Sequence, residues 1–226
     1  KGAAYAAKLA DKDFRDGVRA ELSRPAHFRL FNAQWDQVEV VESADKDAEQ
    51  RSIGELARSA GKDPLDFMLD LALAENLDTV FNAMLLNSDE TAVARMLRHP
   101  ASLVSLSDAG AHLTFFNDAG FGLHLLGHWV RERSALELED AVRRLTSAPA
   151  KLFGIQGRGV LKPGYAADLM LFDPATVGRG TKRRVFDLPG GHPRLTTPPQ
   201  GVHGVWVNGV RDLRSLPGKV LRDFSA

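Results

Sequence analysis

The stretch Ser105-Leu106-Ser107-Asp108-Ala109-Gly110-Ala111-His112 follows an apolar segment that starts at Ala101. This order predicts a buried strand over 101–106 that ends at an exposed acid. In α/β barrel enzymes the catalytic groups lie at the carboxyl ends of strands. The small residues after Asp108 leave room for a metal ion, a water molecule or a substrate, and a carboxylate there can bind a cation or transfer a proton. The same Asp before Ala-Gly also suits a residue that only caps a turn.

A second stretch, Gly157 to Pro174, is rich in turn residues and leads into a short apolar segment over 168–172. Gly159, Pro163 and Gly164 suit turns, and the segment after them suits a packed strand. We therefore assign this stretch a structural role.

The composition is that of an ordinary globular protein, with 44% hydrophobic and 26% charged residues among 226. The net charge is zero, and the basic residues of 179–184 have no stacking aromatics beside them, so we expect no nucleic-acid partner. The absence of cysteine excludes disulfides and thiolate metal sites. No apolar run reaches the roughly 18 residues of a membrane span. The first residues lack the apolar core of a signal peptide, which predicts a cytoplasmic protein with no membrane partner.

Helical periodicity and capping residues predict most of the secondary structure. The expected helices cover 8–22, 52–60, a segment opened by Asp63-Pro64, 88–99, 137–145 and 147–153. The expected strands cover 28–31, 37–41, 79–86, 101–106, 168–172, 184–187 and 202–208. The change in character near Gly154, from α/β to Gly- and Pro-rich β, predicts a boundary there.

Ordered motifs over Ile53 to Asn208 resemble those of one enzyme family. They are Gly-Lys-Asp-Pro (61–64), Leu-Arg-His-Pro (97–100), Ser-Asp-Ala-Gly-Ala-His (107–112), Asp-Ala-Gly (118–120), His-Leu-Leu-Gly-His-Trp-Val-Arg-Glu (124–132), Leu-Glu-Asp-Ala-Val-Arg-Arg-Leu-Thr (138–146), Pro-Ala-Lys-Leu-Phe-Gly (149–154), Ala-Asp-Leu (167–169) and Val-Trp-Val-Asn-Gly (205–209). In these motifs the chain resembles the C-terminal part of N-acyl-D-amino-acid deacylases, a branch of the metal-dependent amidohydrolases.

The resemblance implies an α/β fold: the last strand and helices of a TIM barrel, followed by part of a small β-sandwich. The implied division is an arm or insertion over 1–50, a barrel portion over 51–154 and a sandwich portion over 155–226. It also implies zinc-dependent hydrolysis of an amide bond in a small N-acyl-D-amino acid, with Asp108 as the catalytic acid/base and a metal contact. Cyclic-amide hydrolases of the hydantoinase and dihydroorotase kind share the Asp and the Ala-Asp-Leu passage, so their substrates stay open.

The chain departs from this family in its metal ligands. The family's His-x-His pair does not occur, and a zinc site needs about three protein ligands. A complete barrel needs about 250 residues by itself. Position 1 is Lys, so we expect a part of a longer protein. Because the ligand set and most of the barrel are missing, we expect this part to be inactive alone and to bind no zinc. The alternative is a non-catalytic module or half of a two-chain assembly. Strand edges left unpaired would then favour association of copies.

Three histidines follow Asp108 closely in the sequence, and two of them, His112 and His124, are further site candidates. His112 can contact the acid or a substrate carboxylate, or serve as a loop histidine bound to backbone. His124 and His128 share a helix face by spacing. Leu125 stands where a zinc protease has its catalytic Glu, so we exclude that class. We expect His124 to contact the substrate or to have a structural role beside Trp129.

Overall fold

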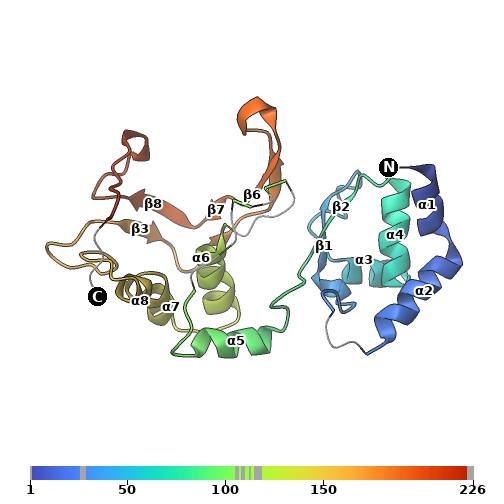
Figure 1. Cartoon of the computed structure of the whole chain (residues 1–226), viewed down its shortest axis with the longest axis horizontal. Coiled ribbons are helices and arrows are strands. Elements are labelled where there is room, and N and C mark those ends of the chain that lie inside the picture. The colour runs from blue at the N-terminus through green and yellow to red at the C-terminus, as the bar shows by residue number, and fades with distance from the viewer. Residues whose placement is uncertain are drawn as a thin grey trace. The chain divides into compact units, whose positions relative to one another are not determined.

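The computed structural model describes residues 2–25, 29–104, 107, 110–111, 113–114 and 119–222. It divides into two compact units, Lys1–Glu90 and Thr91–Ala226, each with its own helices and strands (Figure 1). The elements of the first unit are α1 (Ala3–Ala10), α2 (Lys12–Ser23), the 3₁₀ turn η1 (Trp35–Gln37), β1 (Val38–Glu42), α3 (Ile53–Ala60), α4 (Pro64–Ala74) and β2 (Val80–Ala83).

The second unit begins with the helix that spans the division, and strands dominate its later part. Its elements are α5 (Glu90–Arg98), α6 (Phe121–His124), the π-helix η2 (Leu125–Glu132), α7 (Leu138–Leu145), α8 (Ser147–Leu152), β3 (Leu169–Phe172), β4 (Gly178–Arg179), β5 (Arg183–Val185), the 3₁₀ turn η3 (Pro189–Gly191), β6 (Arg194–Thr196), β7 (Pro199–Gln200), β8 (Val202–Trp206) and the 3₁₀ turn η4 (Leu213–Ser215).

The first unit is built on an antiparallel pair of strands, β1 and β2, in which Val38 lies opposite Ala83. Val38 and Val40 are buried with Ile53 and Leu56 of α3, so one face of the strand pair and one face of the helix share a core. The strand predicted over 37–41 corresponds to β1, and its alternate residues Val38 and Val40 lie on the buried face.

The sequence predicted the Asp63 cap of α4, and the structure adds a cap for α3 from Ser52. The Ser52 hydroxyl accepts a hydrogen bond from the Glu55 amide at 3.1 Å, and Asp63 accepts one from the Asp66 amide at the same distance. Gly61 follows α3 with φ of 63°, a left-handed conformation that favours glycine. Local sequence therefore determines where these two helices begin and where α3 ends.

The helix predicted over 8–22 is in fact two helices. Asp11 has an extended backbone between α1 and α2, and its carboxylate caps α2 by accepting from the Phe14 amide at 2.8 Å. The break lets Leu9 of α1 join Leu65 and Leu69 of α4 in a second core cluster. The prediction was wrong because apolar spacing alone does not reveal a capping residue inside a periodic segment.

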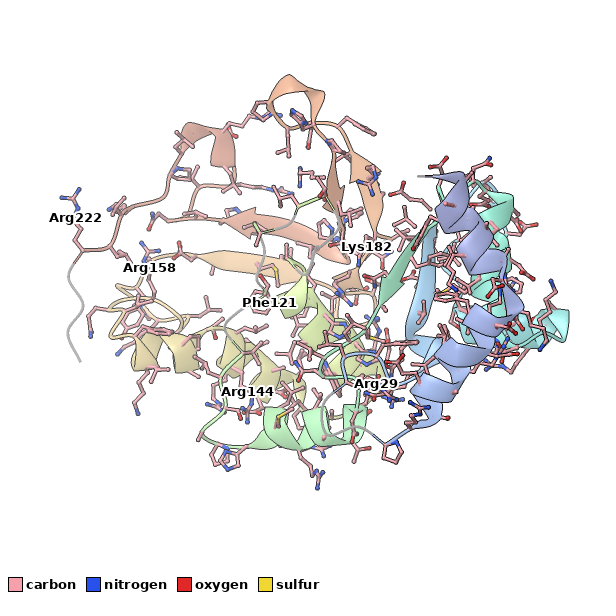
Figure 2. The ribbon with its side chains drawn as sticks, turned by 45° about the vertical axis from the view of Figure 1, so that its right-hand side comes forward. Arg29, Phe121, Arg144, Arg158, Lys182 and Arg222 are labelled. Atoms are coloured by element: carbon pink, nitrogen blue, oxygen red, sulfur yellow. The ribbon has the colours of Figure 1, made fainter. Side chains whose placement is uncertain are left out.

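The strand predicted over 28–31 was also wrong for its described residues, 29–31, which are irregular. Arg29, labelled in Figure 2, donates hydrogen bonds to the carbonyls of Glu21, Leu22 and Arg24 at the end of α2. Phe31 packs edge-on against Trp35, with 5.0 Å between ring centroids. These residues act in a helix cap and an aromatic pair, and β-propensity gave no sign of either role.

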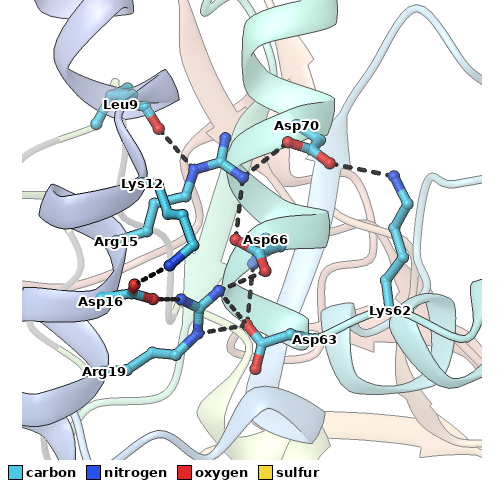
Figure 3. A network of polar contacts seen from close by, with 9 residues as sticks. All are labelled: Leu9, Lys12, Arg15, Asp16, Arg19, Lys62, Asp63, Asp66 and Asp70. Atoms are coloured by element: carbon cyan, nitrogen blue, oxygen red, sulfur yellow. Dashed lines mark hydrogen bonds and ion pairs between the residues drawn. The ribbon is translucent and has the colours of Figure 1, made fainter.

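A network of charged side chains fastens α2 to α4 (Figure 3). Arg15 donates to Asp66 at 3.0 Å and to Asp70 at 2.9 Å, and its Nε atom donates to the carbonyl of Leu9 at 2.8 Å. Arg19 pairs with Asp63 and Asp66. Only 12% of the Arg15 side chain is exposed, so this residue joins α1, α2 and α4 from a largely buried position.

The core of the second unit lies between η2, α7 and β4. Leu125, Leu126 and Trp129 of η2 are buried with Ala141 of α7 and with Val177, which precedes β4. Leu138, Val142 and Leu145 pack against this cluster, so the apolar residues of the helix predicted over 137–145 face the core. Within the described residues, no helix has the length and apolar character needed to span a membrane.

The described strands of the second unit pair antiparallel, β3 with β8, β4 with β7 and β5 with β6. The strands predicted over 168–172, 184–187 and 202–208 correspond to β3, β5 and β8. The strand predicted over 101–106 is wrong for 101–104, which are not extended in a ladder, while 105 and 106 lie outside the described residues. The Ser102 carbonyl of this segment instead accepts a hydrogen bond from the Arg144 side chain.

Candidate functional site

The segment that leads to Asp108 is held by a buried arginine of α7. Arg144, labelled in Figure 2, has a side chain that is only 6% exposed. Its Nε atom donates to Asp140 at 2.6 Å, and its terminal nitrogens donate to the carbonyls of Arg98, His99 and Ser102 at 3.3 to 3.4 Å. The end of α5 and the residues after it are therefore bound to α7.

The far side of the same stretch is held by the β5–β6 hairpin. The Leu195 amide donates to the carbonyl of Leu113, and the Arg184 guanidinium donates to the carbonyl of Thr114, both at 2.9 Å. Chain on both sides of the predicted catalytic loop thus has defined partners from other elements.

Two of the three predicted site residues, Asp108 and His112, lie outside the described residues. Their roles as acid/base and substrate contact stay predictions. His124, the third, ends α6 and is partly buried beside its helix neighbours.

His124 and His128 share a helix face, as their spacing predicted. Their rings stack with 4.7 Å between centroids and 5° between planes, and both meet Trp129 edge-on. The Nδ1 atom of His128 lies 3.1 Å from Oε2 of Glu132. One face of the His124 ring is therefore covered by His128, so a ligand could contact only the other face and the ring edge.

Burial lowers the pKa of His124 to about 4, and the positive charges of Arg179 and His128 act in the same direction. Glu132 opposes the shift but does not outweigh it. The imidazole is consequently neutral at pH 7. A neutral ring can donate or accept a hydrogen bond, but it forms no ion pair with a carboxylate.

Close packing brings η2 against the residue that precedes β4. A Cβ atom on Gly127 would lie 2.7 Å from the carbonyl oxygen of Val177, so the π-helix η2 can approach β4 this closely only with glycine. Arg131 donates to that same carbonyl. No role for Gly127 or Arg131 was predicted from the sequence, although a glycine inside an apolar helix is a recognisable sign of close backbone approach.

The second quoted stretch forms a structural network, as expected. Arg158, labelled in Figure 2, pairs with Asp168 and donates to the side-chain oxygen of Asn208 at 3.0 Å. Asp168 also accepts from the Asn208 amide at 2.9 Å. This network ties the turn after Gly157 to the residues just before β3 and just after β8.

The described residues do not provide a zinc site. Across the ranges that the structure describes, no group of three His, Asp or Glu side chains is placed to hold a metal ion. His124, His128 and Glu132 come close along one helix, but the two rings lie parallel, and their nitrogens do not converge on one point. The donor set therefore does not fit a resident zinc ion, which needs about three convergent ligands.

Comparison with known proteins identifies relatives across most of the chain. The model of the Amidohydrolase family matches residues 16–211. D-aminoacylase of Alcaligenes xylosoxydans xylosoxydans is 34% identical over 161 residues, which cover 70% of this chain and 30% of that protein. An uncharacterized protein of Mycobacterium tuberculosis (strain ATCC 25618 / H37Rv) is 33% identical over 178 residues, covering 74% of this chain and 28% of the relative.

A solved structure gives a weaker likeness. N-acyl-D-glutamate deacylase from Bordetella bronchiseptica, complexed with zinc and a phosphonate inhibitor, has a TM-score of 0.40 and 31% identity, over 79% of this chain and 35% of that one. The chain spans less than a third of the length of the two curated relatives, 30% and 28%. The family match extends over far more than half of the sequence. The chain belongs to the amidohydrolase family.

Proposed function

We propose that this chain supplies the acid/base residue of a zinc-dependent amidohydrolase that removes the acyl group from N-acyl-D-amino acids. The observation that carries the proposal is the family match over residues 16–211, which includes the stretch around Asp108. The substrate class is taken from the relative that is a D-aminoacylase. The activity belongs to a longer protein, in which this chain contributes the last part of the barrel and part of a β-sandwich.

In the proposed reaction Asp108 accepts the proton of the attacking water and passes it to the leaving nitrogen. An amine is a poor leaving group unless it is protonated, so the same carboxyl is useful in both steps. Zinc would supply Lewis-acid stabilisation of the amide oxygen, and its ligands would come from outside the described residues. Alone, this chain is proposed to be inactive.

His112 and His124 are proposed substrate contacts. His124 is neutral at pH 7, so its contribution is a hydrogen bond to an amide or carboxylate oxygen. Charge recognition of a substrate carboxylate would have to come from another residue.

The test uses the longer protein, expressed from its complete reading frame and supplied with zinc. N-acetyl-D-amino acids with different side chains are offered beside their L enantiomers, a hydantoin and dihydroorotate. Asp108→Asn is expected to lower kcat by about 10² to 10⁴-fold, the usual contribution of a positioned acid/base. Asp212→Asn, which keeps an acceptor for the Arg214 amide, is the matched control and should retain activity.

The alternatives give different outcomes. Preferential hydrolysis of dihydroorotate or a hydantoin would replace the linear-amide assignment with a cyclic-amide one. An inactive longer protein that binds no zinc would indicate a non-catalytic module. Full activity in the Asp108→Asn variant would remove Asp108 from the mechanism.

A further inference from the structure

Arg144 makes more contacts than a residue that only stabilises its own helix. One carboxylate and three backbone carbonyls surround its guanidinium, and its side chain is almost fully buried. Burying a cation is costly unless it is paired and hydrogen-bonded. Asp140 supplies the opposite charge, and the three carbonyls accept hydrogen bonds from the terminal nitrogens, so groups from two separated segments offset the cost.

The three carbonyls lie in one short segment. Those of Arg98 and His99 are at the end of α5, where helix carbonyls lack partners within the helix. That of Ser102 lies beyond the helix, in the residues predicted to form a strand. The planar guanidinium donates in several fixed directions at once. It therefore constrains the course of the backbone over 98–102, in addition to holding this segment close to α7.

The anchored segment continues directly into the proposed catalytic stretch. Val104 packs against the core cluster that contains Ala141 of α7, and Asp108 follows four residues later in the sequence. We propose that Arg144 is a positioning residue for Asp108: it holds the 98–102 backbone on α7, and this backbone leads in sequence to the acid/base. This inference rests on the proposed function.

Arg143 provides a closely matched comparison. It is the next residue on α7 and binds the other oxygen of Asp140, with nitrogen–oxygen distances of 3.0 and 2.6 Å. Its side chain is 53% exposed, and its hydrogen bonds to Asp140 stay on α7. Replacing Arg143 removes the same charge from the same carboxylate without removing the donors to the 98–102 carbonyls.

The experiment compares Arg144→Met, Arg144→Lys and Arg143→Met in the longer, zinc-supplied protein. Displacing a catalytic group by about 1 Å costs up to roughly 100-fold, so we expect Arg144→Met to lower kcat by about 10 to 100-fold. KM should change much less, because substrate binding is not the affected step. The acid limb of the pH–rate profile should shift as the surroundings of Asp108 change. Arg144→Lys should recover part of the loss, and Arg143→Met should resemble the wild type.

A second measurement does not depend on activity. Hydrogen–deuterium exchange at the amides of His99 and Ser102, which bond to Met96 and His99, should accelerate in Arg144→Met and not in Arg143→Met. Melting temperatures of both variants identify a general loss of stability, which would lower activity without moving the pH profile.

Each outcome has a defined meaning. Equal kcat in Arg144→Met and Arg143→Met, with an active wild type, would overturn the positioning role alone. Unchanged exchange at His99 and Ser102 would overturn the anchoring. A wild-type longer protein that cleaves no amide would overturn the proposed function, while the exchange experiment would still decide whether Arg144 anchors this backbone.

Discussion

The imidazole rings of His124 and His128 lie parallel, with 4.7 Å between their centroids, on one face of the α6–η2 helix. Burial and nearby positive charge keep His124 neutral, whereas His128 is bonded to Glu132. The pair therefore consists of a partly buried, neutral imidazole, that of His124, and the imidazole of His128, which has a carboxylate partner. This arrangement makes the stability of the second unit sensitive to acid.

The first prediction concerns pH. The pKa of His124 is about 4 in the folded protein and about 6.5 when unfolded, so between these values the unfolded chain binds more protons. Its contribution to stability is complete above pH 6.5 and is lost as the pH falls toward 4. Allowing for partial exposure, the loss is on the order of 2 kcal/mol. Urea unfolding of wild type and His124→Phe at pH 4.5, 5.5 and 7 measures it.

His192→Phe, at an exposed position, is the control for this experiment. We expect the control to follow the wild-type pH dependence and His124→Phe to show a flatter one. An identical slope in all three proteins would contradict the assignment of a buried neutral imidazole.

The second prediction compares two helical glycines. Gly127→Ala places a Cβ atom 2.7 Å from the Val177 carbonyl oxygen, so η2 must move away from β4. Overpacking of this kind costs about 1 to 3 kcal/mol. Gly17→Ala in α2 meets no atom within 4 Å and should stabilise the protein by about 0.5 to 1 kcal/mol. Denaturant unfolding should give opposite signs, and destabilisation by both would show that helix propensity at position 17 was misjudged.

The third prediction concerns the charged network of Figure 3. Arg15→Met removes hydrogen bonds to Asp66, Asp70 and the Leu9 carbonyl from a side chain that is 12% exposed. Loss of such partners costs about 1 to 3 kcal/mol, measured by urea unfolding. Lys12→Met, which breaks an exposed pair with Asp16, is the control and should cause no measurable change. A comparable loss in both variants would show that burial of Arg15 is not what makes the network stabilising.

The fourth prediction concerns the turn after β8. Asn208 has φ of 49° and Gly209 has φ of 80°, the two left-handed residues of an Asn-Gly hairpin turn between Val207 and Val210. The Asn208 side chain also bonds to Arg158 and to the Pro217 carbonyl. Asn208→Ala should cost about 1 to 2 kcal/mol through strain and lost hydrogen bonds. Asn208→Gly should cost less, because glycine tolerates the turn, and thermal unfolding ranks the variants. Equal stability of the alanine and glycine variants would exclude backbone strain as a cause.

Local residues predicted much of the secondary structure because caps and turns act over a few positions. Ser52, Gly61 and Asp63 mark the limits of α3 and α4 by side-chain or backbone geometry that needs no distant partner. The same reasoning failed at Asp11, where a capping residue divides an apolar pattern into two helices. The strand prediction was also wrong at 101–104, because an apolar segment forms a strand only where a neighbouring strand supplies backbone hydrogen-bond partners.

The candidate site was predictable only in part. The sequence by itself determined the family, through ordered motifs over Ile53 to Asn208, and it identified Asp108, His112 and His124 as candidates. Only the tertiary structure revealed that Arg144 binds carbonyls 42 to 46 residues away in the chain and that Gly127 touches the Val177 backbone. The physical reason is that motifs and caps are local in sequence, whereas a buried guanidinium acquires its acceptors only when separate segments pack together.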